Sequence, residues 1–99
     1  MKRQKALNTR YQDVVKILRQ YKIYKRTNTM PKLVEKIDII ISELTREQRV
    51  VMEKSFFEPD IETSEQAIIE IGYLSRNRFY QLKEQILEIF ANVLNEEIA

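Results

Sequence analysis

Apolar residues recur at helical spacing along most of this 99-residue chain, and this periodicity constrains its fold more than any other feature. Between residues 6 and 26, one set of apolar side chains is spaced three or four positions apart: Leu7, Tyr11, Val14, Leu18 and Tyr21. Side chains at that spacing share one face of an α-helix, so an amphipathic helix is predicted over residues 6–26. From Met30 to Leu44, every large apolar residue except Ile39 falls in an arc of roughly 120°, which predicts a second amphipathic helix.

Capping patterns predict three further helices. Thr45–Gln48 and Thr63–Gln66 both carry the capping-box pattern, in which a threonine is followed three residues later by a glutamine. The first pattern opens a helix to about Phe57, and the second opens a short helix through Ile71. Ser75 is placed to cap a fifth helix that ends near residue 95. The fold class that follows is all-α, a five-helix single domain.

The composition excludes most site chemistry. The chain has no Cys, no His and a single glycine, Gly72. It therefore lacks the residues for a thiolate or imidazole metal site, a Ser-His-Asp triad, a P-loop or a dinucleotide fingerprint. The acidic segment at residues 58–62 lacks the glycine and ligand spacing of a calcium loop, so we interpret it as a surface loop. We expect a binding protein and not an enzyme, with no metal, no cofactor and no small-molecule substrate.

The formal net charge of +2 is unevenly distributed. Residues 1–36 hold eleven Lys or Arg and two acids, a charge of +9, whereas residues 37–99 carry −7. Within the acidic part, Arg76, Arg78 and Lys83 form a basic island with no acid among residues 75–83. Two basic islands in an otherwise acidic chain indicate a polyanionic partner.

Residues 63–90 outline a helix-turn-helix: a short helix, a turn around Gly72, and a longer helix capped by Ser75. On the longer helix, the core-facing positions are Phe79, Leu82, Ile86, Ile89, Phe90 and Val93. The positions that point away are Asn77, Tyr80, Gln81, Glu84 and Glu88, with Arg76 and Arg78 beside them. The N-terminal residues of such a second helix face base edges in the major groove, and arginine and amide side chains suit guanine and adenine there.

The segments Leu44–Arg49 (LTREQR) and Leu74–Lys83 (LSRNRFYQLK) together resemble the C-terminal helix-turn-helix of sigma factors. With the tail Ile86–Leu94, they are most similar to the ArpU/RinA-type transcriptional regulators of bacteriophages and prophages. The chain departs from the family pattern at Gly72, which lies one residue further from the helix cap than expected. The resemblance implies a sequence-specific DNA-binding regulator, typically an activator of late genes, acting in the cytoplasm of the bacterial host cell. Residues 1–43 then form an N-terminal basic helical hairpin, and residues 44–99 form the helix-turn-helix DNA-binding region.

This hypothesis assigns to double-stranded DNA the polar residues at the predicted groove surface: Ser64, Ser75, Arg76, Asn77, Arg78, Tyr80, Gln81 and Lys83. Arg76 and Asn77 reach base edges, and the residues one turn later continue the readout. Arg78 and Lys83 hold phosphates and fix the register. Near Ser64, the N-terminus of the fourth helix donates backbone N–H groups to a further phosphate.

The basic helix over residues 6–26 offers auxiliary phosphate contacts through Lys16, Arg19 and Arg26. The alternatives for this surface are a solvated face, a membrane-surface helix or a partner-facing helix. Because one half-site read by so small a module binds weakly, we expect either a homodimer or docking on RNA polymerase. The alternative function is a helical adaptor or antagonist of the transcription machinery that does not itself bind DNA. No apolar run approaches a membrane span, and polar residues follow Lys2, Arg3 and Lys5 where a signal peptide would be apolar. We therefore expect no signal peptide and no membrane partner.

Overall fold

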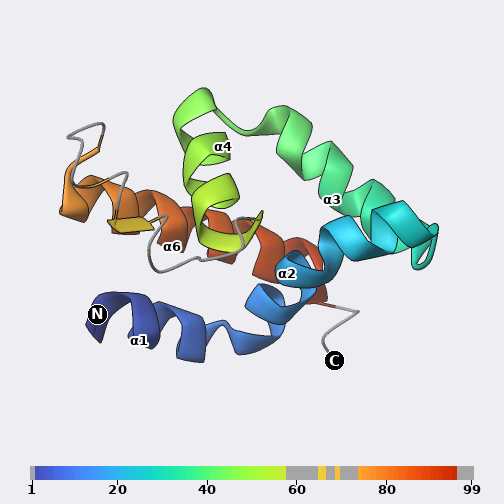
Figure 1. Ribbon diagram of the computed structural model, residues 1–99, viewed down its shortest axis with the longest axis horizontal. Helices are drawn as coiled ribbons and strands as arrows, with labels where there is room; N and C mark the ends of the chain where they lie inside the picture. The colour runs from blue at the N-terminus through green and yellow to red at the C-terminus, as the bar shows by residue number, and fades with distance from the viewer. Residues whose placement is uncertain (1, 58–64, 67–68, 70–73, 96–99) are drawn as a thin grey trace.

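The computed structural model describes residues 2–57, 65, 66, 69 and 74–95, and this part of the chain is helical with no strand (Figure 1). Its elements are α1 (Lys2–Arg10), α2 (Gln12–Thr27), α3 (Pro31–Glu43), α4 (Arg46–Met52), the π-helical turn η1 (Glu53–Phe57) and α6 (Arg76–Val93). Residues 65, 66 and 69, between η1 and α6, are also helical. The all-α prediction is confirmed.

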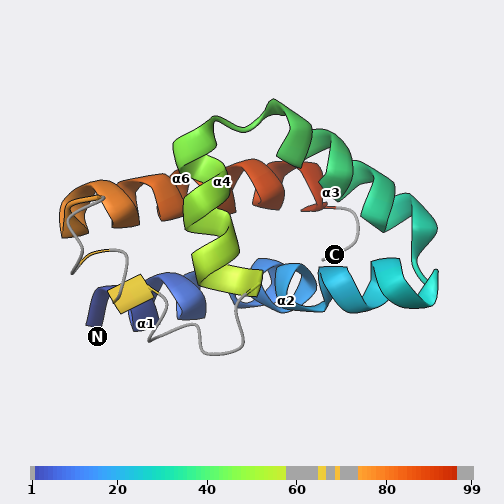
Figure 2. The same cartoon turned by 45° about the horizontal axis from the view of Figure 1, so that its top comes forward.

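Helix α6 is the centre of the molecule. It contacts α1, α2, α3 and α4, and α4 runs across it in both views (Figures 1 and 2). The N-termini of α1 and α6 lie at one end of the molecule, and the turn between α2 and α3 lies at the opposite end. The two ends therefore present different surfaces.

The hydrophobic core draws on all of these elements. Its fully buried apolar side chains include Leu18 of α2, Ile37 of α3, Val51 of α4 and Phe79 of α6. Burial of each such side chain contributes roughly 1.5–3 kcal/mol relative to an exposed one. One core thus joins residues on both sides of the predicted boundary at residues 43 and 44.

The prediction of one continuous helix over residues 6–26 is wrong, because the helix breaks at Tyr11. There φ is −114° and ψ is 36°, outside the helical region. Backbone hydrogen bonds still bridge the break, from Tyr11 N to Leu7 O (3.1 Å) and from Val15 N to Tyr11 O (2.9 Å). The kink turns α1 along α6, where Arg10 forms an ion pair with Glu84 at 3.2 Å. Tertiary packing thus overrides the regular spacing of the apolar residues.

The predicted capping box of α4 is confirmed. The Thr45 hydroxyl accepts a hydrogen bond from Gln48 N at 3.2 Å, and the Gln48 side chain accepts one from Thr45 N at 2.9 Å. Arg49 in this helix closes the preceding one, since its guanidinium donates to the carbonyls of Ile41 and Ser42, both at 3.1 Å. The Ile41 carbonyl also accepts from Leu44 N, the C-cap of α3, at 3.2 Å. The last carbonyls of a helix lack the usual intrahelical donors, and a cation is also favourable at the helix C-terminus.

Two residues on the predicted apolar faces are nearly half exposed. Met30, the residue before α3, is 49% exposed and has a left-handed backbone (φ 51°). Val93 is 42% exposed on the last turn of α6. Ser64, Gly72 and the predicted acidic loop at residues 58–62 lie outside the described residues, as does most of the predicted helix over residues 63–71.

Candidate nucleic-acid interface

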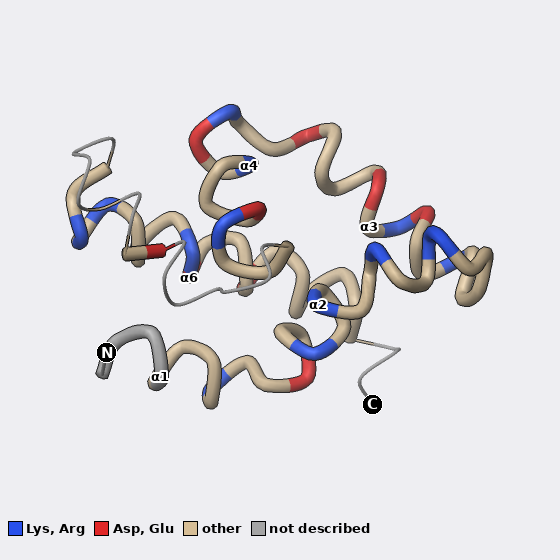
Figure 3. Tube along the Cα trace, viewed as in Figure 1, with Lys and Arg blue, Asp and Glu red and all other residues tan. Residues whose placement is uncertain are grey.

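The first turn of α6 is an exposed basic surface. Ser75 begins the helix as predicted: its Oγ accepts a hydrogen bond from Arg78 N at 3.1 Å. Arg76, Asn77 and Arg78 follow, all exposed, and no acid lies in this turn (Figure 3). The cap leaves neighbouring backbone N–H groups and the positive end of the helix dipole at the same surface.

One further predicted contact, Gln81, is also exposed. It lies one turn after Asn77, on the side of α6 that faces away from the core. Four of the side chains assigned to base edges or phosphates are therefore exposed: Arg76, Asn77, Arg78 and Gln81. Their donors and acceptors are of the kind that recognises base edges and phosphate oxygens.

The assignment of Tyr80 and Lys83 to a DNA surface is wrong, because both side chains are fully buried. The Tyr80 ring packs edge-on against Phe79, with ring centroids 5.3 Å apart. The sequence-based wheel assumed one narrow core-facing stripe. Because several helices pack against α6, its buried residues instead span an arc of about 160° at 100° per residue.

Lys83 instead forms a buried ion pair. Its Nζ lies 2.9 Å from a carboxylate oxygen of Glu65, which also accepts a hydrogen bond from Ser55 Oγ at 3.0 Å. The exposed side-chain fractions of Lys83 and Glu65 are 0% and 1%. Burial raises the pKa of Glu65 and lowers the pKa of Lys83, and their mutual attraction opposes both shifts.

The sequence reasoning missed two residues that border this surface. Gln85 is exposed and lies one turn beyond Gln81 on the same side of α6. Arg10 of α1 pairs with Glu84, so it neutralises an acid beside the amide side chains. If Tyr80 is assigned to the core, the outer side of the helical wheel shifts and includes Gln85. Nothing in the sequence signals the pairing of Arg10 with Glu84.

Arg78 has an acidic neighbour, Glu47 of α4, at 3.8 Å. Both side chains are about half exposed, at 47% and 46%. Exposed pairs of this kind contribute roughly 0–1 kcal/mol, so a phosphate is able to displace the carboxylate at little cost.

A second basic surface runs along α2. The predicted auxiliary contacts Lys16, Arg19 and Arg26 are exposed there, and Lys22 joins them. These four residues are spaced three or four positions apart, so they form one stripe about 15 Å long. Within the described residues, Lys16 and Arg26 form no ion pair. The ammonium of Lys22 lies 5.1 Å from the centroid of the Phe57 ring.

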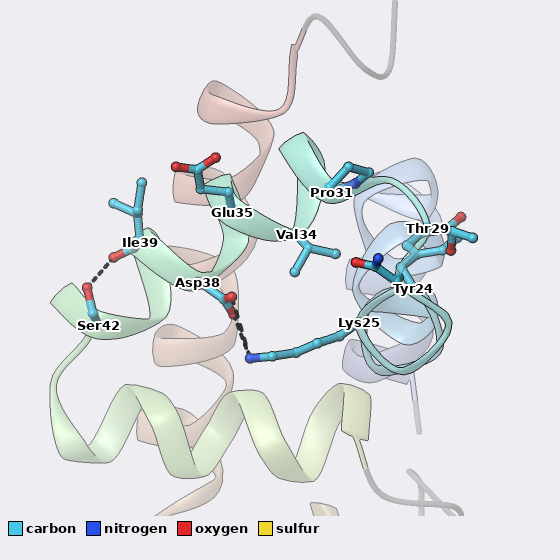
Figure 4. A pocket seen from close by; sticks show the side chains of 10 residues that line it. Tyr24, Lys25, Thr29, Pro31, Val34, Glu35, Asp38, Ile39 and Ser42 are labelled. Carbon is cyan, nitrogen blue, oxygen red and sulfur yellow. Dashed lines mark hydrogen bonds and ion pairs between the residues drawn. The ribbon is translucent and has the colours of Figure 1, made fainter.

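A groove of about 430 Å³ lies between α2 and α3, near the end remote from the α6 N-terminus (Figure 4). Val34 points into it from α3, and Lys25 reaches across to Asp38 at 3.3 Å. Tyr21 donates a hydrogen bond to the same carboxylate. Burial and Asp38 raise the pKa of Tyr21, and hydrogen bonds to Tyr21 and Asp38 raise the pKa of Lys25. Tyr21, Lys25 and Asp38 thus pair with one another at the groove. The groove is a surface separate from the basic interface at the start of α6.

Comparison with protein-family models, with curated proteins and with solved structures finds no match to this chain. No helix among the described residues has both the length and the apolar character of a bilayer span. In the same part of the chain, no group of three or more acidic side chains is arranged to hold a metal ion. The functional interpretation therefore rests on the residues of the two basic surfaces.

Proposed function

We propose that this chain is a sequence-specific regulator of transcription that binds duplex DNA and has no catalytic activity. The observation that carries the proposal is the exposed start of α6. Asn77, Arg78 and Gln81 lie on the side of the helix that faces away from the core, and Arg76 is exposed as its first residue. The first turns of an α-helix fit the major groove, and these side chain types hydrogen-bond to guanine and adenine edges.

The distribution of acids along α6 supports the same orientation. Glu84 and Glu88 lie two and three turns beyond the N-terminus, and Glu84 is paired with Arg10. Entry of the helix by its N-terminus keeps these carboxylates outside the groove, away from the phosphates along its edges. Arg78 then binds a phosphate at the groove edge.

The basic stripe of α2 provides the sequence-independent part of the affinity. Lys16, Arg19, Lys22 and Arg26 present four positive charges without an acid between them. Neutralising a phosphate releases counterions, so each such contact contributes about 0.9 to the slope of log affinity against log salt. The resemblance to ArpU/RinA-type regulators supports a role in phage or prophage late-gene activation in the bacterial cytoplasm, as a homodimer or together with RNA polymerase.

Selection of bound fragments from random duplexes, followed by titration at several salt concentrations, tests this function. Arg76→Ala should weaken binding to the selected site by about 1–3 kcal/mol and relax the preference at one base pair. Arg26→Ala should weaken binding equally on all duplexes and lower the salt slope by about 0.9. Lys32→Ala, which removes an exposed cation of α3 outside both surfaces, is the matched control and should leave both quantities unchanged.

Absence of duplex binding at low salt would refute this function. The alternative is then an adaptor or antagonist that binds a protein of the transcription machinery, and the α2–α3 groove is the observation that favours it. The 53% exposed side chain of Ile39 and the apolar Val34 and Tyr24 line this groove. In that case Ile39→Glu, and not Arg76→Ala, should abolish capture of the partner.

A further inference from the structure

Three segments meet at the buried ion pair of Lys83. Ser55 comes from η1, Glu65 from the helical residues that precede α6, and Lys83 from α6 itself. The Glu65 carboxylate accepts from both partners, at 3.0 and 2.9 Å, and the Lys83 ammonium also lies 5.8 Å from the Phe56 ring centroid. These residues are distant in sequence, since 10 positions separate Ser55 from Glu65 and 18 separate Glu65 from Lys83.

An ion pair is an inefficient way to fill this space. Lys83 lies among the apolar side chains of α6, with Phe79, Ile86 and Leu87 within one turn of it, all fully buried. Desolvation of two charges costs several kcal/mol per ion, and well-packed apolar residues of similar volume are often as stable or more so. The pair therefore needs an explanation other than net stabilisation.

Directionality distinguishes the ion pair from apolar packing. Apolar contacts tolerate small rotations and slides of one helix on another, whereas a buried carboxylate and ammonium must keep their hydrogen bonds or remain uncompensated. A rotation of α6 by about 30° would move side chains at a helix radius of about 5–6 Å by roughly 3 Å, the length of a hydrogen bond. A shift of that size would break the Lys83–Glu65 contact.

We propose that Glu65 and Lys83, supported by Ser55, are positioning residues that fix the rotation of α6 and so aim its exposed N-terminal side chains at the DNA. Lys83 lies seven residues, or about 10 Å, beyond Arg76 on the same rigid helix, so a rotation fixed at one is fixed at the other. The role at the DNA rests on the proposed function. The fixing of α6 is measurable without DNA.

The absence of cysteine from the chain allows a direct measurement. Spin labels are attached to cysteines introduced at Gln66, beside Glu65, and at Gln85 on the outer side of α6. The distance distribution between the labels is then measured by pulsed electron paramagnetic resonance. We compare the labelled protein that keeps Glu65 and Lys83 with the labelled apolar double variant Glu65→Leu/Lys83→Met, after circular dichroism has shown that each protein is helical.

The expected result is a narrow distribution of label-to-label distances when Glu65 and Lys83 are present, and a broader or shifted distribution in the double variant. Binding of the double variant to the selected duplex should weaken about tenfold, the equivalent of one misaligned base contact, and its discrimination should fall. Leu87→Met is the matched control, because it alters the buried face of α6 but leaves both charges in place. It should leave the distance distribution and the affinity unchanged.

An unchanged distance distribution in the folded double variant would overturn the proposal. If the double variant does not fold, Ser55→Ala gives the same test, because it keeps both charges and removes one partner of the carboxylate. Broadening in Ser55→Ala supports the positioning role, and an unchanged distribution contradicts it. If wild-type protein binds no duplex but the distributions still differ, the proposed function fails and the fixing of α6 remains.

Discussion

Replacing Lys83 by Met should destabilise the protein more than its small change in shape suggests. The substitution keeps a long, flexible side chain in the core but removes the ammonium that lies 2.9 Å from the Glu65 carboxylate. Ser55 remains as a hydrogen-bond donor, at 3.0 Å, but it supplies no charge. The variant therefore buries a carboxylate that has lost its hydrogen-bonded cation, and of the charges that act on it the more distant attraction of Arg19 remains.

The cost follows from the burial of both partners, at 0% and 1% exposed. Removing one member of such a pair costs about 3–5 kcal/mol, a large share of the 5–15 kcal/mol that stabilises a typical domain. With a urea m value of about 1.5 kcal/mol/M, the unfolding midpoint should fall by roughly 2–3 M. Glu65→Leu/Lys83→Met should recover most of this loss, because neither charge remains.

The pH dependence gives a sharper test. Burial raises the pKa of Glu65 above its ordinary value of 4.5, and loss of the Lys83 charge raises it further. The folded variant then binds a proton more tightly than the unfolded chain, so its stability rises as the pH falls from neutral towards 4.5. The wild-type protein should gain less stability over the same pH range, because protonation of Glu65 leaves the Lys83 ammonium without its charged partner.

Urea unfolding followed by far-UV circular dichroism at pH 7 and pH 5 measures both effects. Leu87→Ala is a control of similar severity, because a core cavity costs about 2–5 kcal/mol without a change in charge. Its loss of stability should be the same at both pH values. A loss below about 1 kcal/mol for Lys83→Met, or one that does not shrink at pH 5, would refute the assignment of a buried, charge-compensated carboxylate.

Two smaller predictions concern the ends of helices. Ser75→Ala removes the hydroxyl that accepts a hydrogen bond from Arg78 N at 3.1 Å, and it should lower the free energy of unfolding by about 1 kcal/mol in thermal or urea unfolding. Ser75→Asp should keep the cap and the stability. Equal losses in the two variants would contradict the capping role. Met30→Gly should stabilise the protein by about 0.5–1 kcal/mol, because a left-handed backbone is unfavourable for methionine and its side chain is half exposed. Asn28→Gly is the matched case, and a gain equal to that of Met30→Gly would show that strain is not the cause, since asparagine tolerates this conformation.

The starts of α4 and α6 follow from short sequence patterns at the helix ends. The capping box of Thr45 and Gln48 and the cap at Ser75 were identified because such patterns depend on residues within one turn. The break at Tyr11 has no such signature. It depends on the packing of α1 along α6, between segments more than seventy residues apart.

The candidate interface was predicted in part for the same reason. Arg76, Asn77 and Gln81 are exposed as the periodicity indicated, but Tyr80 and Lys83 are buried. A helical wheel gives the direction of each side chain and not the number of neighbours that cover it. The polar ends of tyrosine and lysine favour an exposed assignment, and only the position of Glu65 reveals why a lysine is accommodated in the core.

The central position of α6 has a consequence for divergence between related sequences. Its inner positions are held by contacts with four other helices, so most substitutions there change stability. Its outer positions, such as Gln81 and Gln85, are exposed, and substitutions there usually alter stability by less than about 0.5 kcal/mol. Under the proposed function, new recognition chemistry can therefore accumulate on a few surface positions of this helix while the buried face stays the same.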